Sequence, residues 1–472
     1  MKKRNKYKIG VLLLSTTLLT SCLAVKNFEQ PTVKETQENT FRTPSQTVSS
    51  KDTVSMATVS WKTIFTDGYL QEYIDKGLAN NFDLQIAIKQ MNSAESYLKQ
   101  GKAGFLPTFS IGASLTDQEI SKNSRFGGLS SDRSIQTYQL NGNLAWEADI
   151  WGKIRSSKRA SYASFLKTSA AQQAVRTELI SRIATTYYQL LAFDAQLKIT
   201  NQTIETRKKG LETIIALKEA GQVTQIAVDQ NIAQYNSAQA LKVDLETAIF
   251  QLENSFSILL GTAPQKFQRS ALNKQSIDTD MKIGVPALLL SNRPDVRSAQ
   301  YSLMETFELK NVAKSSFYPS LTLTASGGFQ SLEIDKWLSV NSIFADIIGG
   351  ITQPIFNQRK LKTQLEVAKN TEAEALLNYR KTLLVAGGEV SNALYAYRAE
   401  TTKFQFRLKE AEALTHAEMN SEELLKNGYA NYLDLLTARQ SSLSAQLNLV
   451  DSKLKQLTTV VDLYKALGGG VE

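Results

Sequence analysis

Two stretches of the chain decide its fold: residues 105–118 read FLPTFSIGASLTDQ and residues 317–330 read FYPSLTLTASGGFQ. After each Phe-x-Pro the chain alternates apolar and small polar side chains, which is the period of a β-strand. A second alternating run follows each of the two. We therefore predict four strands, at about 105–117, 135–149, 317–331 and 342–355. Ten alternating residues suffice for a tilted strand to cross a bilayer, but half-buried strands of a soluble protein give the same pattern.

The two stretches belong to an internal repeat. Phe105 and Phe317 are 212 residues apart, and Gly221 and Gly428 are 207 apart. We expect two structural repeats and a linker in an equatorial region between them. The expected boundaries are 61–261 for the first repeat, 262–290 for the linker, 291–468 for the second repeat and 469–472 for a C-terminal tail.

Each strand pair leads into a long helix. In the second half, apolar side chains recur at steps of three and four from Leu361 to Leu408, the spacing of a coiled coil. The first long helix is expected over about 153–219 and should end at Gly221, because glycine suits the left-handed residue after a helix. Shorter helices are expected to return over about 226–260 and 432–467, and the segments 68–103 and 291–316 are expected to be helical as well.

The first 22 residues carry targeting signals. Five basic residues precede an apolar core from Ile9 to Leu19, the pattern of a secretory signal peptide over 1–21. It ends in Leu-Thr-Ser-Cys, which resembles the lipobox of bacterial lipoproteins and implies a diacylglycerol and an N-acyl chain on Cys22. The alternative is a stray cysteine beside an ordinary cleavage site. A flexible tether is expected over 22–60, which is polar and lacks an apolar period.

Composition excludes several classes of protein. Loss of residues 1–21 removes five basic and no acidic residues, so the net charge falls from +9 to +4 and a nucleic-acid partner is not expected. Cys22 and His416 are the only cysteine and histidine, which excludes a disulfide scaffold and a multi-histidine metal site. His416 and Met419 could share a soft metal, but two ligands make a poor site. With no catalytic motif either, we expect neither an enzyme, nor a metal, nor a cofactor beyond the acyl chains.

Four strands cannot close a barrel. An open sheet in lipid would leave two edges of unpaired backbone groups, which hydrocarbon does not tolerate. Closure therefore requires several copies of the chain. Three copies would supply twelve strands, a number within the range of known membrane barrels.

Several longer motifs lie in the two halves. They are Trp61-Lys62-Thr63-Ile64-Phe65, Gly77 to Leu84 (GLANNFDL), Glu147 to Lys153 (EADIWGK), Asn292 to Arg297 (NRPDVR) and Phe317 to Leu323 (FYPSLTL). Together they resemble the TolC-like outer-membrane factors of tripartite efflux pumps, in particular their lipoprotein branch, the NodT family. The resemblance runs from Trp61 to Gly468. It implies a mainly α fold with a membrane β part. Three protomers of four strands each would form a 12-strand outer-membrane β-barrel that continues into a long periplasmic α-helical barrel.

This resemblance implies a function and partners. The homotrimer would be the passive exit duct of an efflux system, docked to a periplasmic adaptor and an inner-membrane pump. It would lie in outer-membrane lipid, anchored by Cys22, with polar loops 117–134 and 330–342 outside the cell. Drugs, metal ions, lipids or proteins could be the cargo. The alternative is a non-conducting lipoprotein scaffold, which would have no need for two pairs of alternating runs.

The resemblance also suggests particular site residues. The periplasmic tips would lie at Gly221 and Gly428. Asp434 would line the tip constriction, with Asp229 as its approximate repeat mate; the alternative is that both aspartates only stabilise helix N-termini. Trp146 and Trp151 would form an aromatic girdle at the membrane interface, or else pack in an ordinary core. The family's tyrosine–arginine tip lock is not matched, because Leu425 and Ala430 stand in its place.

Overall fold

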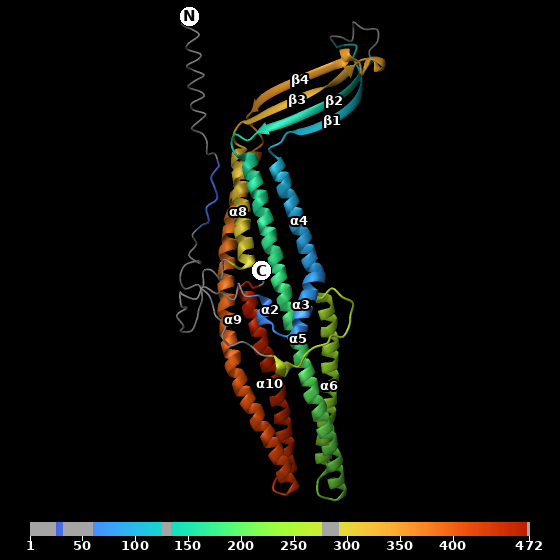
Figure 1. Ribbon diagram of the computed structural model, residues 1–472, viewed down its shortest axis with the longest axis vertical. Helices are drawn as coiled ribbons and strands as arrows, with labels where there is room; N and C mark the ends of the chain where they lie inside the picture. The colour runs from blue at the N-terminus through green and yellow to red at the C-terminus, as the bar shows by residue number, and fades with distance from the viewer. Residues whose placement is uncertain (1–24, 32–59, 125–133, 276–291, 470–472) are drawn as a thin grey trace. The chain divides into compact units, whose positions relative to one another are not determined.

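The computed structural model describes residues 25–31, 60–124, 134–275 and 292–469 (Figure 1). The signal peptide, Cys22 and most of the segment expected to be a tether lie outside these residues. Contacts along the chain define two units. Unit 1 comprises residues 1–31, 92–167 and 300–378, and unit 2 comprises 32–91, 168–299 and 379–472.

Unit 1 contains one antiparallel sheet with the order β1-β2-β3-β4. The strands are β1 (Thr108–Glu119), β2 (Ser134–Ala148), β3 (Ser320–Ser331) and β4 (Ile343–Thr352). Pairing of β2 with β3 joins the two halves of the sequence in one sheet. The strands β1 and β3 begin three residues later than predicted, directly after Pro107 and Pro319, because proline has no N–H to give to a ladder.

The connection between β3 and β4 contains two short helices, η4 (Ile334–Lys336) and η5 (Val340–Ser342). The sequence predicted a polar loop here. That description was incomplete, because four large apolar side chains of the loop are exposed: Leu332, Ile334, Leu338 and Val340.

The helices confirm the repeat in their lengths. The long helices α5 (Lys153–Glu219) and α9 (Lys360–Lys426) have 67 residues each, and the returning helices α6 (Gln225–Leu259) and α10 (Tyr432–Ala466) have 35 each. The helices α4 (Phe82–Ala103) and α8 (Pro294–Ser315) have 22 each. Among the described residues, no helix is both long and apolar enough to cross a membrane. The predicted fold class, mainly α with four strands per chain, is confirmed.

The segment 68–103, predicted to be helical, consists of two helices. The first is α3 (Gly68–Asn80), which follows the single-turn helix α2 (Trp61–Ile64). Asn81 separates α3 from α4 with an extended backbone, φ −61° and ψ 129°. Its side-chain oxygen accepts a hydrogen bond from the N–H of Leu84 at 3.0 Å, so Asn81 caps the N-terminus of α4.

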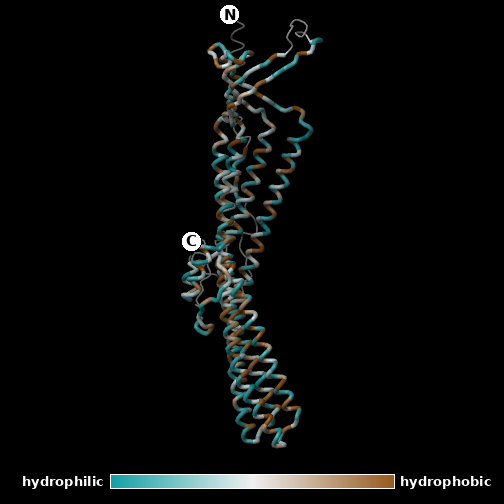
Figure 2. Tube along the Cα trace, turned by 90° about the vertical axis from the view of Figure 1, so that its right-hand side faces the viewer, coloured by the Kyte–Doolittle hydropathy of each residue, from teal (hydrophilic) through white to brown (hydrophobic). Residues whose placement is uncertain are grey.

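The core of unit 2 lies where α3, α5, α6 and α10 pack together. Tyr187, Phe256 and Tyr464 are fully buried there. Figure 2 shows hydrophobic and hydrophilic segments alternating along the helical hairpins, as expected for helices with one packed face.

The described part of the linker, residues 262–275, belongs to this core. It includes η3 (Leu272–Lys274), and Leu272 is buried. Arg269 donates from Nη2 to Asp194 at 2.9 Å and from Nη1 to Glu253 at 2.6 Å. The tail also starts in contact with the fold, since Thr177 donates to the carbonyl of Gly469 at 2.6 Å.

Residues 25–31, hereafter the strap, lie against unit 1 and not free in solvent. Asn27 accepts a hydrogen bond from Arg159 of α5 at 3.0 Å, and the carbonyl of Lys26 accepts one from Asn311 of α8 at 3.0 Å. Phe28 packs edge-to-face on Phe307, with ring centroids 5.5 Å apart. The tether expected over 22–60 therefore includes a docked segment.

Candidate functional site

The two helical hairpins turn in the same way. Gly221 has φ +74° and Gly428 has φ +76°, values that favour glycine. In the first turn, the N–H of Gln222 donates to the carbonyl of Leu217 at 2.9 Å. In the second, the N–H of Tyr429 donates to Leu424 at 2.8 Å. These are Schellman motifs, so the backbone conformation of both turns depends on the glycine.

Asp434 takes part in a capping box at the start of α10. The side chain of Asn431 accepts from the N–H of Asp434 at 3.0 Å, and the Asp434 carboxylate accepts from the N–H of Asn431 at 3.1 Å. This geometry supports the helix-cap interpretation. Asp434 is nevertheless exposed, so its charge also reaches solvent at the turn.

Asp229 and Asp434 are only approximate repeat mates, two residues out of register. Asp229 is the fifth residue of α6, whereas Asp434 is the third of α10, and Ala227 occupies the equivalent place. Two residues turn a helix by about 200°, so the two carboxylates point in different directions. Asp229 is exposed and accepts a hydrogen bond from Gln225 at 2.8 Å.

A buried polar network joins the two hairpins, and the sequence did not reveal it. Arg207 of α5 is only 5% exposed; its Nη2 donates to Gln440 of α10 at 3.0 Å, and it also donates to the carbonyl of Gln234 of α6. Arg439 of α10 pairs with Glu422 of α9 at 3.2 Å. All four helices of the two hairpins thus contribute to one network.

Two guanidinium groups share this network. Burial, followed by the nearby charge of Arg439, lowers the pKa of Arg207. Among the described residues, Arg207 has no carboxylate within ion-pair distance, while Arg439 also approaches Glu418 at 4.0 Å. Gly210 makes room for Arg439, because a Cβ at that position would lie 2.8 Å from its Nη1. This explains why α5 has a glycine inside a helix, where it is normally unfavourable.

The strand register gives the sheet one apolar and one polar face. The polar face carries mainly Thr, Ser, Asn and Gln, together with glycine and a few apolar residues such as Ile348. The apolar face carries Phe109, Ile111, Leu115, Leu140, Leu144, Trp146, Leu321, Leu323, Phe329, Ile343, Ile347 and Ile351. Many of these apolar side chains are exposed, including Ile347 at 77%. A sheet with one exposed apolar face suits contact with lipid.

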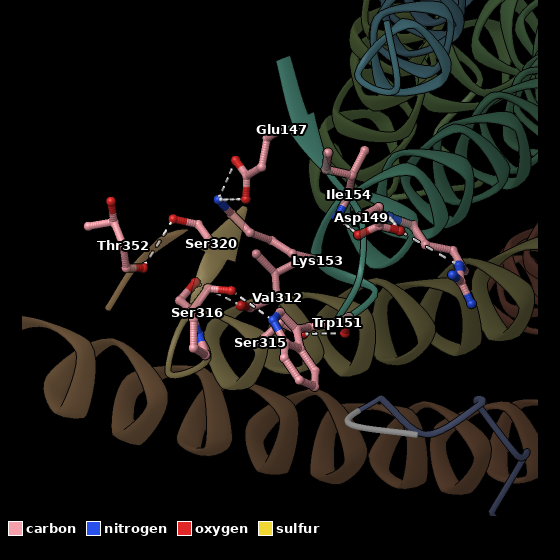
Figure 3. A network of polar contacts seen from close by, with 12 residues as sticks. Glu147, Asp149, Trp151, Lys153, Ile154, Val312, Ser315, Ser316, Ser320 and Thr352 are labelled. Carbon is pink, nitrogen blue, oxygen red and sulfur yellow. Dashed lines mark hydrogen bonds and ion pairs between the residues drawn. The ribbon is translucent and has the colours of Figure 1, made fainter. Parts of the chain in front are cut away.

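The two tryptophans have different surroundings. Trp146 lies on the apolar face of β2, opposite Leu323, and its indole donates to the carbonyl of Phe105 at 3.0 Å. Trp151 follows the end of β2 and joins the two repeats (Figure 3). Its indole donates to the carbonyl of Pro319 at 2.7 Å and stacks on Tyr318 with centroids 4.9 Å apart. Trp151 thus packs at the junction of the two repeats, in addition to any role at the membrane interface.

The same junction contains an ion pair. Figure 3 shows Lys153 donating to both carboxylate oxygens of Glu147, at 3.0 and 3.1 Å. Asp149 accepts from the N–H of Ile154 at 2.8 Å and caps the start of α5. Within the described part of the chain, no three His, Cys, Asp or Glu side chains are grouped to hold a metal ion.

Comparison with known proteins agrees with this architecture. The family model for outer membrane efflux proteins matches residues 73–262 and 285–469. The solvent efflux pump outer membrane protein SrpC of Pseudomonas putida is 29% identical over 456 residues, 96% of each chain. The cation efflux system protein CusC of Escherichia coli is 24% identical over 455 residues, again 96% of each chain.

Solved structures of similar chains have the same fold. The Campylobacter jejuni CmeC outer membrane channel superimposes with a TM-score of 0.85 at 25% identity, covering 95% of both chains. The Neisseria gonorrhoeae MtrE outer membrane channel in its open state gives 0.82 at 25% identity, covering 95% of this chain and 98% of that one. Because the family model covers both repeats, the chain belongs to the outer membrane efflux protein family.

Proposed function

We propose that this chain forms the exit duct of a tripartite efflux system. Three copies make a channel in the outer membrane that passively conducts substrates out of the periplasm, while an adaptor and an inner-membrane pump supply and drive them. The observation that carries this function is the sheet: one face is apolar and exposed, the other is mostly polar, and no described residue pairs with either edge strand. The similar efflux pump and channel proteins support it.

The open edges explain the homotrimer. The edge strands β1 and β4 have no partner among the described residues. In hydrocarbon these backbone groups must be paired, so β4 of one copy joins β1 of the next. Three sheets of four strands close a 12-strand barrel, with the apolar face toward lipid and the polar face toward a water-filled lumen.

The hairpin turns form the periplasmic tips, where the adaptor docks and the duct is closed at rest. Leu425 and Ala430 replace the tyrosine and arginine of the family's lock. Arg439, with Glu418 and Glu422, holds α9 and α10 of the second hairpin together, and Arg207 ties the first hairpin to Gln440 of the second; the pairing distances support both roles. Asp434 adds a carboxylate near each turn, and three copies would favour cations there.

Lipid attachment at Cys22 is part of this proposal, and the strap supports it. Val25 of the strap lies beside Gly152, the residue directly before α5, and its Cγ2 is 3.1 Å from the position that a Cβ on Gly152 would take. Two residues lie between Cys22 and Val25, and the three Cα–Cα steps from Cys22 to Val25 span at most about 11 Å. The acyl chains of Cys22 therefore enter the membrane near the junction of β2 and α5. Trp146 at this junction suits the aromatic girdle.

Lipid attachment has a direct test in cells fed radiolabelled palmitate. We expect label in the wild-type protein and none in Cys22→Ser, because Cys22 supplies both the thiol and the new N-terminus. Label of equal strength in the Ser variant would contradict acylation at Cys22. The Ser variant still has its strap, so its barrel is expected to insert, although less efficiently.

The exit duct and the alternative, a non-conducting lipoprotein scaffold, predict opposite sides of the outer membrane for the β3–β4 connection. Lys336→Cys places a thiol in the β3–β4 connection, and Lys242→Cys places one on α6 as a matched control. Cys22, the only native cysteine, carries lipid in the mature duct and gives no background. A membrane-impermeant maleimide should label Lys336→Cys in intact cells and Lys242→Cys only after permeabilisation. If both label only after permeabilisation, the sheet lies in the periplasm and the scaffold is correct.

A further inference from the structure

The polar face of the sheet has one row of side chains in which each member is paired with the next across all four strands. The register pairs Ser110 with Asn143, Asn143 with Ser326, and Ser326 with Asp346. Three members of the row are neutral, and the fourth is a carboxylate. Asp346 is exposed, and no hydrogen bond or ion pair joins it to another described residue.

No positive charge lies on the strands to balance Asp346. The four strand sequences contain no lysine or arginine. Glu147 is the only other acidic residue on the polar face, and Lys153 pairs with it at 3.0 Å. Asp117 lies on the opposite face near the end of β1, where Ser134 and Gln136 donate to it. Asp346 is therefore the one unpaired charge on the polar face of the described strands.

We propose that Asp346 determines the charge preference of the barrel lumen, so that the outer part of the duct favours cationic over anionic cargo. This inference rests on the proposed trimeric barrel. Symmetry places three copies of Asp346 at one height, three residues along β4 from Ile343. A ring of like charges inside a low-dielectric wall attracts cations and repels anions. The neutral rest of the row leaves this field uncompensated.

The test measures the local potential without requiring an open tip. Asn143→Cys puts a thiol in the same row, two strands from Asp346 and so about 10 Å away. Its reaction rates with a cationic and with an anionic methanethiosulfonate, both added outside intact cells, give a ratio. We expect Asp346→Asn to lower the ratio of cationic to anionic rate about twofold at physiological ionic strength, and more in dilute buffer where screening is weaker.

A second cysteine variant shows whether the change in the rate ratio is confined to the row that contains Asp346. Thr116→Cys lies on the polar face six residues from Ser110 along β1, so about 20 Å from the row, and its ratio should change little. An unchanged ratio at Asn143→Cys on replacing Asp346 would overturn the inference while leaving the duct intact. Failure of Asn143→Cys to react with either reagent would also overturn it, because position 143 would not face water. If the chain does not form a trimeric duct at all, this is recognised separately, because the heat-sensitive trimer is then missing or Lys336→Cys is not labelled in intact cells.

Discussion

Asn81 and Arg293 stand at equivalent positions of the two repeats and make the same contact with different side chains. Asn81 donates to the carbonyl of Leu259 at 3.0 Å, and Arg293 donates to the carbonyl of Ala466 at 2.8 Å. Leu259 and Ala466 are the last residues of α6 and α10. Each contact therefore joins the end of a returning helix to the start of the next one, α4 or α8.

The close approach of the backbones explains the glycines at these junctions. Gly261 and Gly468 have φ +64° and +78°. A Cβ on Gly261 would lie 2.5 Å from the carbonyl oxygen of Asn80, and one on Gly468 would lie 3.0 Å from Cα of Arg293. The motifs Asn80 to Leu84 and Asn292 to Val296 are thus structural: they stack helices end to end.

Asn81→Ala should destabilise the first junction. The variant leaves the N–H of Leu84 and the carbonyl of Leu259 without their partner, a loss of about 1–2 kcal/mol per protomer in the free energy of unfolding. Thermal unfolding of the detergent-solubilised trimer, followed by circular dichroism, would show a lower midpoint. Asn236→Ala is the control, because Asn236 is exposed and bonds only within its own helix. Equal midpoints for the two variants would refute the junction role.

Gly428→Val should distort the second hairpin turn. No atom lies within 4 Å of a Cβ at this position, so the cost comes from the left-handed backbone alone and is about 1 kcal/mol or more per copy. We expect weaker adaptor docking and export, measured by crosslinking and substrate efflux, with barrel insertion unchanged. Gly428→Asn is the control, since asparagine tolerates this backbone. If the Val and Asn variants behave alike, backbone conformation is not what the adaptor recognises.

Two substitutions of Asp434 separate its cap from its charge. Asp434→Asn retains an acceptor for the N–H of Asn431, whereas Asp434→Ala removes it and costs about 1 kcal/mol of helix stability. We expect only the Ala variant to unfold earlier, while both variants lose cation preference in planar bilayers. A reversal potential that neither variant changes would leave Asp434 with the cap role alone.

The sequence predicted the helices well where a local signal marks their ends. Glycine and the helical spacing placed α5, α6 and α10 to within a residue. Asn81 separates two helices by capping the N-terminus of α4, which is a weaker signal than glycine, so the break inside the helical segment 68–103 was not predicted.

Contacts between distant segments could not be predicted in the same way. Arg207 and Arg439 are 232 residues apart on helices of similar composition, and nothing local distinguishes them from solvated charges. Gly210 was the one available signal, since a glycine inside a long helix indicates a close neighbour. The strap escaped prediction because its polar composition resembles that of the rest of the tether.

The closed tip should depend on pH through Glu422. A hydrogen bond from Lys426 and the charge of Arg439 lower the pKa of Glu422, although its partial burial acts in the opposite direction. When folding lowers the pKa of a carboxylate, the contact is fully stabilising at pH values above the ordinary pKa of 4.5. This stabilisation is lost as the pH falls through the lowered pKa. Trimer conductance should therefore rise at acid pH below 4.5.

Two variants test this pH dependence. Glu422→Gln should conduct more at pH 7 and lose the rise at acid pH, whereas Glu246→Gln, from an exposed pair on α6, should behave like wild type. An identical acid response in Glu422→Gln would exclude Glu422 as the titrating group.

A conducting duct whose tips close it at rest is tested most directly by single-trimer conductance in planar bilayers. Wild-type trimers should conduct poorly at pH 7. Arg439→Met removes the pairs with Glu418 and Glu422, and Gly210→Ala displaces the same guanidinium without removing it. Both variants should raise the conductance severalfold, and Arg182→Met, from an exposed pair within α5, should not. Inserted trimers that conduct no current in any of these variants would contradict the duct and favour the scaffold.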